Sequence, residues 1–160
     1  MTSLAPTQPL TPSERRIAQH VIKGLEPREI AAAIQLKLGT VHTTLRTVRW
    51  KVACPERCSL AVVAHRLLES GQVTAPAPQR PAPDLSPGQS GLIRAVAEHT
   101  RPRDIALAAG LVPADLRAAL DQLLDAAGAQ DTTELVVLAH GWQLLPAGQS
   151  ARATRSGAPL

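Results

Sequence analysis

The chain contains the same segment twice. Residues 10–68 align without a gap on residues 85–143, at a constant offset of 75 positions. Leu60 is repeated as Leu135, for example, and His65 as His140. A period of this length indicates two copies of one small domain, because a solenoid needs three or more short units to bury its core. The fold must therefore be one that about 60 residues can complete, either alone or with the help of the other copy.

The signals within each copy predict helices. Residues 11–14, Thr-Pro-Ser-Glu, form a capping box with proline at the first helical position, and Gly24 is expected to end that helix. We expect a short helix over 28–34, a third helix beginning near Gly39, and a fourth over roughly 57–69. The third helix is expected to bury Val41, Leu45, Val48 and Val52. No segment alternates with the period of a strand for long enough to predict a sheet.

The predicted fold is all-α, with two tandem four-helix domains joined by a Pro/Ala-rich linker. The expected parts are a disordered N-terminus (1–9), a first domain (10–73), the linker (74–84), a second domain (85–145) and a disordered tail (146–160). Alternating prolines favour an extended linker, roughly 30 Å long when fully stretched. Because the chain has no Phe and no Tyr, Trp50 and Trp142 are the only large side chains available to anchor the cores.

The two copies carry opposite charge. Residues 10–73 hold ten Lys/Arg and five Asp/Glu, a balance of +5, whereas residues 85–145 hold four Lys/Arg and seven Asp/Glu, a balance of −3. The net charge of +4 conceals this asymmetry. The first copy suits an anionic partner and the second does not.

Two helices joined by a short turn, the second with a basic outer face, describe a helix-turn-helix. In the first copy His42, Thr43, Arg46 and Arg49 lie away from the apolar stripe and face outward. An outward arginine can bond bidentately to guanine, and a threonine methyl can meet a thymine methyl. Arg28, Lys37 and Lys51 surround them as candidate phosphate contacts.

The first copy also resembles a known family. The residues that carry the resemblance are Leu10-Thr11-Pro12-x-Glu14-Arg15, Gly24-Leu25, Glu29-Ile30-Ala31, Gly39-Thr40-Val41, Leu45, Lys51 and Arg57. With this spacing, residues 10–68 resemble the DNA-binding domain of LuxR/FixJ-type transcription regulators. The second copy is identified only through the first.

The resemblance implies that the third helix enters the major groove of double-stranded DNA. It places base contacts at His42, Thr43 and Arg46, and backbone contacts at Thr40 and Lys51. Together with the outward basic residues, the predicted phosphate contacts are Arg28, Lys37, Thr40, Arg49 and Lys51. The family usually carries a receiver or ligand-binding module before this domain. Since only nine residues precede Leu10, we expect control through abundance, a partner or the second copy.

The second copy is not expected to bind DNA directly. Arg117, Ala118 and Asp121 replace the three base-contacting positions, and Asp115 adds another carboxylate to the same helix. Phosphates repel carboxylates, so this face predicts a partner instead. The candidates are a second copy of the chain (a homodimer partner), RNA polymerase, or the basic face of the first repeat. Trp142, on the fourth helix, would either anchor such an interface or close the core.

Other function classes find little support in the sequence. The histidines have no Ser, Cys or carboxylate constellation around them, and no Gly-rich phosphate loop is present, so no enzyme is predicted. Cys54 and Cys58 lack the further ligands that a zinc site needs, so neither a metal nor a cofactor is expected. No small-molecule ligand is evident, and no apolar stretch is long enough for a membrane span. We expect a cytoplasmic, nucleoid-associated protein.

The sequence therefore predicts a bacterial DNA-binding transcriptional regulator that acts through the first repeat. The alternative is an interaction module without DNA specificity, which binds RNA polymerase or another regulator through the acidic second repeat.

Overall fold

The structure is a computed structural model and describes residues 8–54 and 57–145. These residues form eight helices and no strand, which confirms the predicted all-α class. The helices are α1 (Pro12–Ile22), α2 (Pro27–Ile34), α3 (Leu38–Lys51), α4 (Leu60–Glu69), α5 (Pro87–Glu98), α6 (Pro102–Ala109), α7 (Pro113–Ala127) and α8 (Thr132–Gly141). The first seven residues and the tail from 146, for which disorder was predicted, lie outside the described part.

The first helix of each repeat begins with a capping box. At α1 the Thr11 hydroxyl accepts from the Glu14 N–H at 3.2 Å, and the Glu14 carboxylate accepts from the Thr11 N–H at 2.9 Å. At α5, Ser86 and Gln89 make the same two bonds at 3.1 and 3.0 Å. These bonds satisfy N–H groups that the first turn of a helix leaves open, so both copies start their helices at equivalent positions.

The turn between the second and third helices needs a left-handed residue in both copies. Gln35 fills this position in the first repeat with φ 58°, and Gly110 fills it in the second with φ 73°. The following amides, of Leu36 and Leu111, close the turns by donating to the carbonyls of Ala31 and Ala106. Glycine adopts this conformation freely, whereas glutamine does so at a cost.

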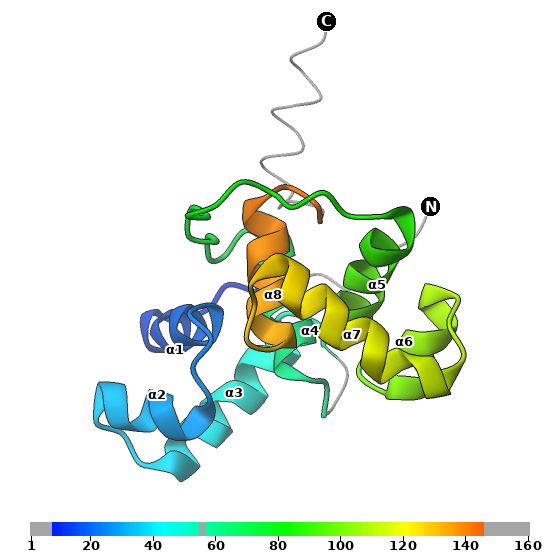
Figure 1. The fold of residues 1–160 in the computed structure, drawn as a ribbon. Coiled ribbons are helices and arrows are strands. Elements are labelled where there is room, and N and C mark those ends of the chain that lie inside the picture. The colour runs from blue at the N-terminus through cyan, green and yellow to red at the C-terminus, as the bar shows by residue number, and fades with distance from the viewer. Residues whose placement is uncertain (1–7, 55–56, 146–160) are drawn as a thin grey trace, which may run out of the picture.

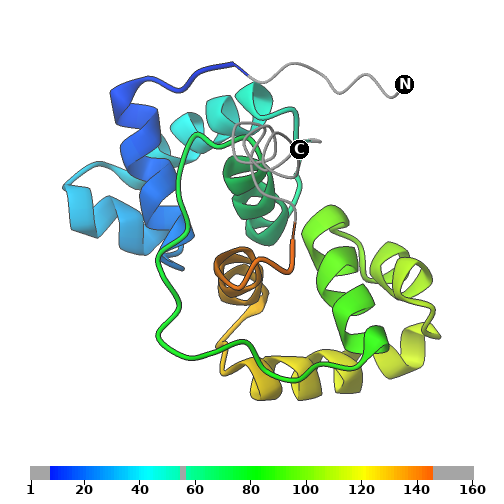
Figure 2. The same cartoon turned by 90° about the horizontal axis from the view of Figure 1, so that it is seen from above.

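The fourth helices of the two repeats pack against each other at the centre of the molecule. Figures 1 and 2 show α4 and α8 side by side, with α1–α3 on one side and α5–α7 on the other. In Figure 2 the central pair separates α3 from α7. The acidic helix of the second repeat therefore does not cover the basic helix of the first, which was one of the arrangements considered from the sequence.

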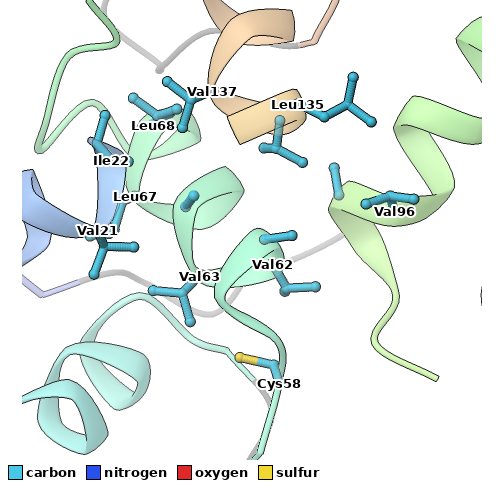
Figure 3. Packing of buried hydrophobic residues seen from close by; sticks show 14 of the residues in the cluster. Val21, Ile22, Cys58, Val62, Val63, Leu67, Leu68, Val96, Leu135 and Val137 are labelled. Carbon is cyan, nitrogen blue, oxygen red and sulfur yellow. The ribbon is translucent and has the colours of Figure 1, made fainter. Parts of the chain in front are cut away.

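One hydrophobic core runs through both repeats. The apolar stripe predicted for α3 is buried throughout: Val41, Val48 and Val52 have no exposed surface and Leu45 is 1% exposed. The same cluster continues from α1 through α4 into α8 and α5 (Figure 3). The labelled members on this path are Val21, Ile22, Val62, Val63, Leu67, Leu68, Leu135, Val137 and Val96. Each copy is thus completed by the other.

The linker runs round the outside of the molecule and is fastened to the end of α8 (Figure 2). The indole Nε1 of Trp142 donates to the Arg80 carbonyl at 2.8 Å. Gly141 leaves room for the chain here, since a Cβ at this position would lie 2.9 Å from the Pro78 side chain. The linker therefore packs against the second repeat at the end of α8.

Three expectations about local structure need correction. The fourth helix starts at Leu60 rather than near Arg57, because Arg57 is left-handed at φ 62° and Ser59 caps the helix. Trp50 does not anchor the core, since 66% of its surface is exposed. Gln8, placed in the disordered N-terminus, is held by hydrogen bonds to Lys51 and Gln72.

No helix in the described ranges is long and apolar enough to span a membrane.

Candidate nucleic-acid interface

Helix α3 presents two unlike faces. Its apolar stripe packs into the core beneath α1 and α2, which fixes the helix at the surface of the first repeat. The opposite face carries the side chains predicted to contact DNA bases, and His42, Thr43 and Arg46 are all exposed. Since they lie within five residues of one helix, they form one short, continuous surface of a size that a major groove admits.

The polar groups on this face differ in their freedom to bind a ligand. The Thr43 hydroxyl donates to the Gly39 carbonyl at 3.0 Å, so the methyl group is what Thr43 offers to a partner. Thr47, one turn later, is tied in the same way to the Thr43 carbonyl at 3.3 Å. Arg46 is exposed, and no hydrogen bond of its side chain is found within the described residues.

The residues predicted to contact phosphates fall into two groups. Arg28 is exposed in the first turn of α2, and Lys37 and Thr40 are exposed at the start of α3. The first turn of α3 has no side-chain cap at Lys37, so its amide groups remain open to an anion. These groups suit contact with a DNA backbone.

Lys51 and Arg49 are instead engaged within the protein. The Lys51 ammonium lies 2.7 Å from the Glu14 carboxylate, and both side chains are largely shielded from solvent. Burial alone raises the pKa of Glu14, but the hydrogen bond and charge of Lys51 hold it below its usual value. Arg49 reaches across to the chain before α4, where its Nη2 donates to the Cys58 carbonyl at 3.3 Å. Both side chains thereby tie α3 to neighbouring segments.

A cavity of about 980 Å³ opens along the C-terminal half of α3. The described residues that line it are His42, Arg46, Thr47, Arg49, Trp50, Cys54, Arg57 and Cys58. Trp50 and Arg57 are the members that the sequence reasoning did not assign to the site. The signal for Trp50 was its spacing, because His42, Arg46 and Trp50 follow one another at intervals of four and must share a face.

The two cysteines interact at the base of this cavity. The neighbouring Cys58 thiol and burial raise the pKa of Cys54, and the neighbouring Cys54 thiol lowers that of Cys58 to about 7, with Arg49 adding to the second effect. Both cysteines are free. Within the part of the chain that the structure describes, no three His, Cys, Asp or Glu side chains gather as they would around a metal ion.

The equivalent face of the second repeat is acidic and apolar. Asp115 and Asp121 are exposed on α7, and Arg117 is the cation between them. Two apolar side chains are exposed nearby, Leu107 on α6 at 79% and Val112 in the turn before α7 at 59%. Trp142, the third residue predicted for a partner interface, lies at the other end of the repeat, where it holds the linker.

Comparison with protein families gave a match for the first repeat. Residues 8–64 match the model of the bacterial regulatory proteins of the luxR family. The matched region spans α1 to α3 and the first half of α4, and therefore contains the whole exposed face of α3. Comparisons with curated proteins and with solved structures gave no match. The first repeat is a LuxR-type helix-turn-helix domain, a DNA-binding module of bacterial transcription regulators.

Proposed function

We propose that the protein regulates transcription by placing α3 of the first repeat in the major groove of DNA. The observation that carries the proposal is the exposure of His42, Thr43 and Arg46 on one face of a helix whose other face is fully buried. In this role Arg46 bonds to a guanine edge, and the Thr43 methyl contacts a thymine. The buried stripe holds these groups in fixed relative positions.

Contacts with the DNA backbone come from residues at the starts of α2 and α3. Arg28, Lys37 and Thr40 flank the base-reading face, and the open amides of the first turn add a further anion contact. Each cation that neutralises a phosphate releases counterions and steepens the salt dependence of binding. Arg49 and Lys51 contribute by positioning α3, since the Lys51 ammonium pairs with Glu14 and the Arg49 guanidinium donates to the Cys58 carbonyl.

The test is DNA affinity in an Arg46→Ala variant. We expect binding to a duplex selected from a random library to weaken by about 1–3 kcal/mol, with relaxed base preference at one position. Fluorescence anisotropy at fixed salt measures the change. The matched control is Arg103→Ala, which removes the same charge from an exposed site on the second repeat and should leave affinity nearly unchanged. Equal losses in the two folded variants would show that Arg46 contributes only charge.

A second candidate function follows from the exposed face of the second repeat. Leu107 and Val112 are the two most exposed aliphatic side chains among the described residues, and acidic groups lie on the adjoining helix α7. Exposed apolar surface bordered by charge is typical of protein interfaces. In this reading the repeat binds RNA polymerase or another regulator. A Leu107→Asp/Val112→Asp variant should then lose the partner in a pull-down with purified RNA polymerase while its DNA affinity stays unchanged.

A further inference from the structure

Equivalent residues of the two repeats meet at the centre of the molecule. Nδ1 of His65 lies 2.9 Å from Nε2 of His140, and the ring centroids are 5.1 Å apart. The two histidines are separated by 75 positions, which is the offset of the repeat. Contact between a residue and its own equivalent occurs where a two-fold axis crosses an interface, as in a symmetric homodimer. The second repeat is therefore related to the first as one subunit of a dimer is to the other.

The remaining contacts follow the same relation. Helix α4 packs on its equivalent α8, α4 also packs on α5, and reciprocally α8 packs on α1. Figure 3 shows Val137 of α8 pointing toward Leu68 of α4 and lying near Ile22 of α1. Each repeat thus contacts the other through equivalent helices, as the two subunits do in an isologous interface, but here both belong to one chain.

The interface leaves no open face on α4. Seven of its ten residues are buried, among them Val62, His65 and Leu68. A helix that is apolar all round must be covered on all sides. In this structure α1 of its own repeat shares that task with α5 and α8 of the other.

We infer that the second repeat is the built-in pairing partner of the first, so that one chain reads one DNA site as a monomer. The DNA part of this inference rests on the proposed function. A two-fold partner normally supplies a second reading helix, and operators are palindromic for that reason. Here the helix in that place is α7, whose Asp115 and Asp121 repel phosphates. The site that the chain recognises is therefore a single, non-palindromic one.

The first experiment uses the full-length protein without DNA. Sedimentation velocity from 1 to 100 µM should give the mass of one chain, 16.9 kDa, at every concentration. NOE spectroscopy at the lowest usable concentration should show a cross-peak between the His65 and His140 rings. A mass that rises to that of a dimer, or an absent cross-peak, would overturn the inference.

A matched pair of variants tests whether the central interface suppresses self-association. Val137→Asp places a carboxylate between α8 and α4, and we expect it to free α4 and produce concentration-dependent dimers. Leu107→Asp adds the same charge to an exposed position of the same repeat and should remain a monomer. A folded, monomeric Val137→Asp chain with the cross-peak lost would count against the inference. Should this variant not fold, the two wild-type measurements decide.

Stoichiometry on DNA completes the test. On a duplex with one copy of the selected site, native mass spectrometry should find one chain, and on an inverted pair of sites two chains that bind without cooperativity. Two chains on a single copy would contradict the inference. If the protein binds no duplex, the proposed function is wrong. Sedimentation velocity and the NOE measurement use no DNA, so they still test whether the two repeats pair within one chain.

Discussion

The third helices of the two repeats share a fold position but not a surface. Core residues correspond closely: Val48 and Leu123 are equivalent, and neither has any exposed surface. Outside the core, Arg46 corresponds to Asp121, and Lys51 to Ala126. The comparison shows that a small helical domain keeps its fold through its apolar stripe, while its outer face can change charge completely. Fold and surface charge are thus separable properties of this chain.

The cores of the two repeats differ in how deeply their third helices are buried. Leu45 is 1% exposed, whereas its equivalent Leu120 is only partly buried. Leu45→Ala should lower the free energy of unfolding by about 2–5 kcal/mol, because it leaves a cavity that the core cannot fill. Leu120→Ala should cost clearly less, as measured by urea denaturation at neutral pH. Equal losses would mean that the two third helices are packed alike.

The pair of central histidines predicts a loss of stability in mild acid. Burial lowers the pKa values of His65 and His140 from 6.5 to about 4, assisted by the charge of Arg66 at His65 and by His65 at His140. Both are neutral in the folded chain, so the unfolded chain takes up protons first as the pH falls. Stability should be constant above pH 6.5 and should decrease between pH 6.5 and 4, by about 1.4 kcal/mol per pH unit for each histidine.

Urea denaturation between pH 7.5 and pH 4.5 measures this slope. Glu69 lies 3.9 Å from His65, and its carboxylate can offset part of the cost by pairing with the protonated ring. Replacing both histidines, in His65→Leu/His140→Leu, should flatten the profile between pH 6.5 and 4, because the two buried imidazoles that the unfolded chain protonates are gone. A wild-type profile as flat as that of the double variant would refute the burial of the pair.

A smaller effect should distinguish Lys51, which positions α3, from Lys37, which is proposed to bind phosphate. Lys51→Ala should cost about 1 kcal/mol of stability, since it removes a partly buried ion pair with Glu14 that the second repeat lacks. Lys37→Ala should leave stability unchanged and reduce the salt slope of DNA binding by about one. Thermal unfolding should therefore change only in Lys51→Ala, and the salt dependence of DNA binding measured by anisotropy only in Lys37→Ala. If the salt slope fell in Lys51→Ala and not in Lys37→Ala, Lys51 rather than Lys37 would be the phosphate contact.

The smallest effect concerns the left-handed turns. Gly110→Ala should lower stability by about 1 kcal/mol, because a Cβ is disfavoured at φ 73°. Gln35→Gly, at the equivalent turn, should change stability by less than that, since relief of the strained backbone is offset by the greater freedom of the unfolded chain. Thermal denaturation of both variants tests the comparison.

Local sequence signals were sufficient for the helices and for the exposed face of α3. Capping boxes, prolines and the spacing of Val41, Leu45 and Val48 act within one element, so the sequence contains the information directly. The partners of Arg49 and Lys51 depend on which segments the fold brings near α3, and no spacing along the chain reveals this. The sequence could therefore assign these two side chains to DNA but could not show their contacts with the Cys58 carbonyl and Glu14.

The pairing of the repeats was also hidden in the sequence, but one signal pointed to it. Residues 60–68 are apolar on every side apart from Arg66 and His65, which exceeds what one small domain can cover. The recurrence of His65 as His140 showed that the two histidines hold equivalent positions in the repeats. It could not show that the two rings meet, because periodicity describes each helix separately and says nothing about which helices pack together.

Because His65 and His140 meet within one chain, the dependence of DNA-site occupancy on protein abundance differs from that of a dimeric regulator. Two segments on one tether meet at an effective concentration that the linker sets, whatever the number of molecules in the cell. Separate subunits must first find each other, so their active form grows with the square of their abundance when they are scarce. For a chain that carries its own partner, occupancy of the DNA site rises in simple proportion to the number of molecules, and halving the gene dose halves the response at low occupancy.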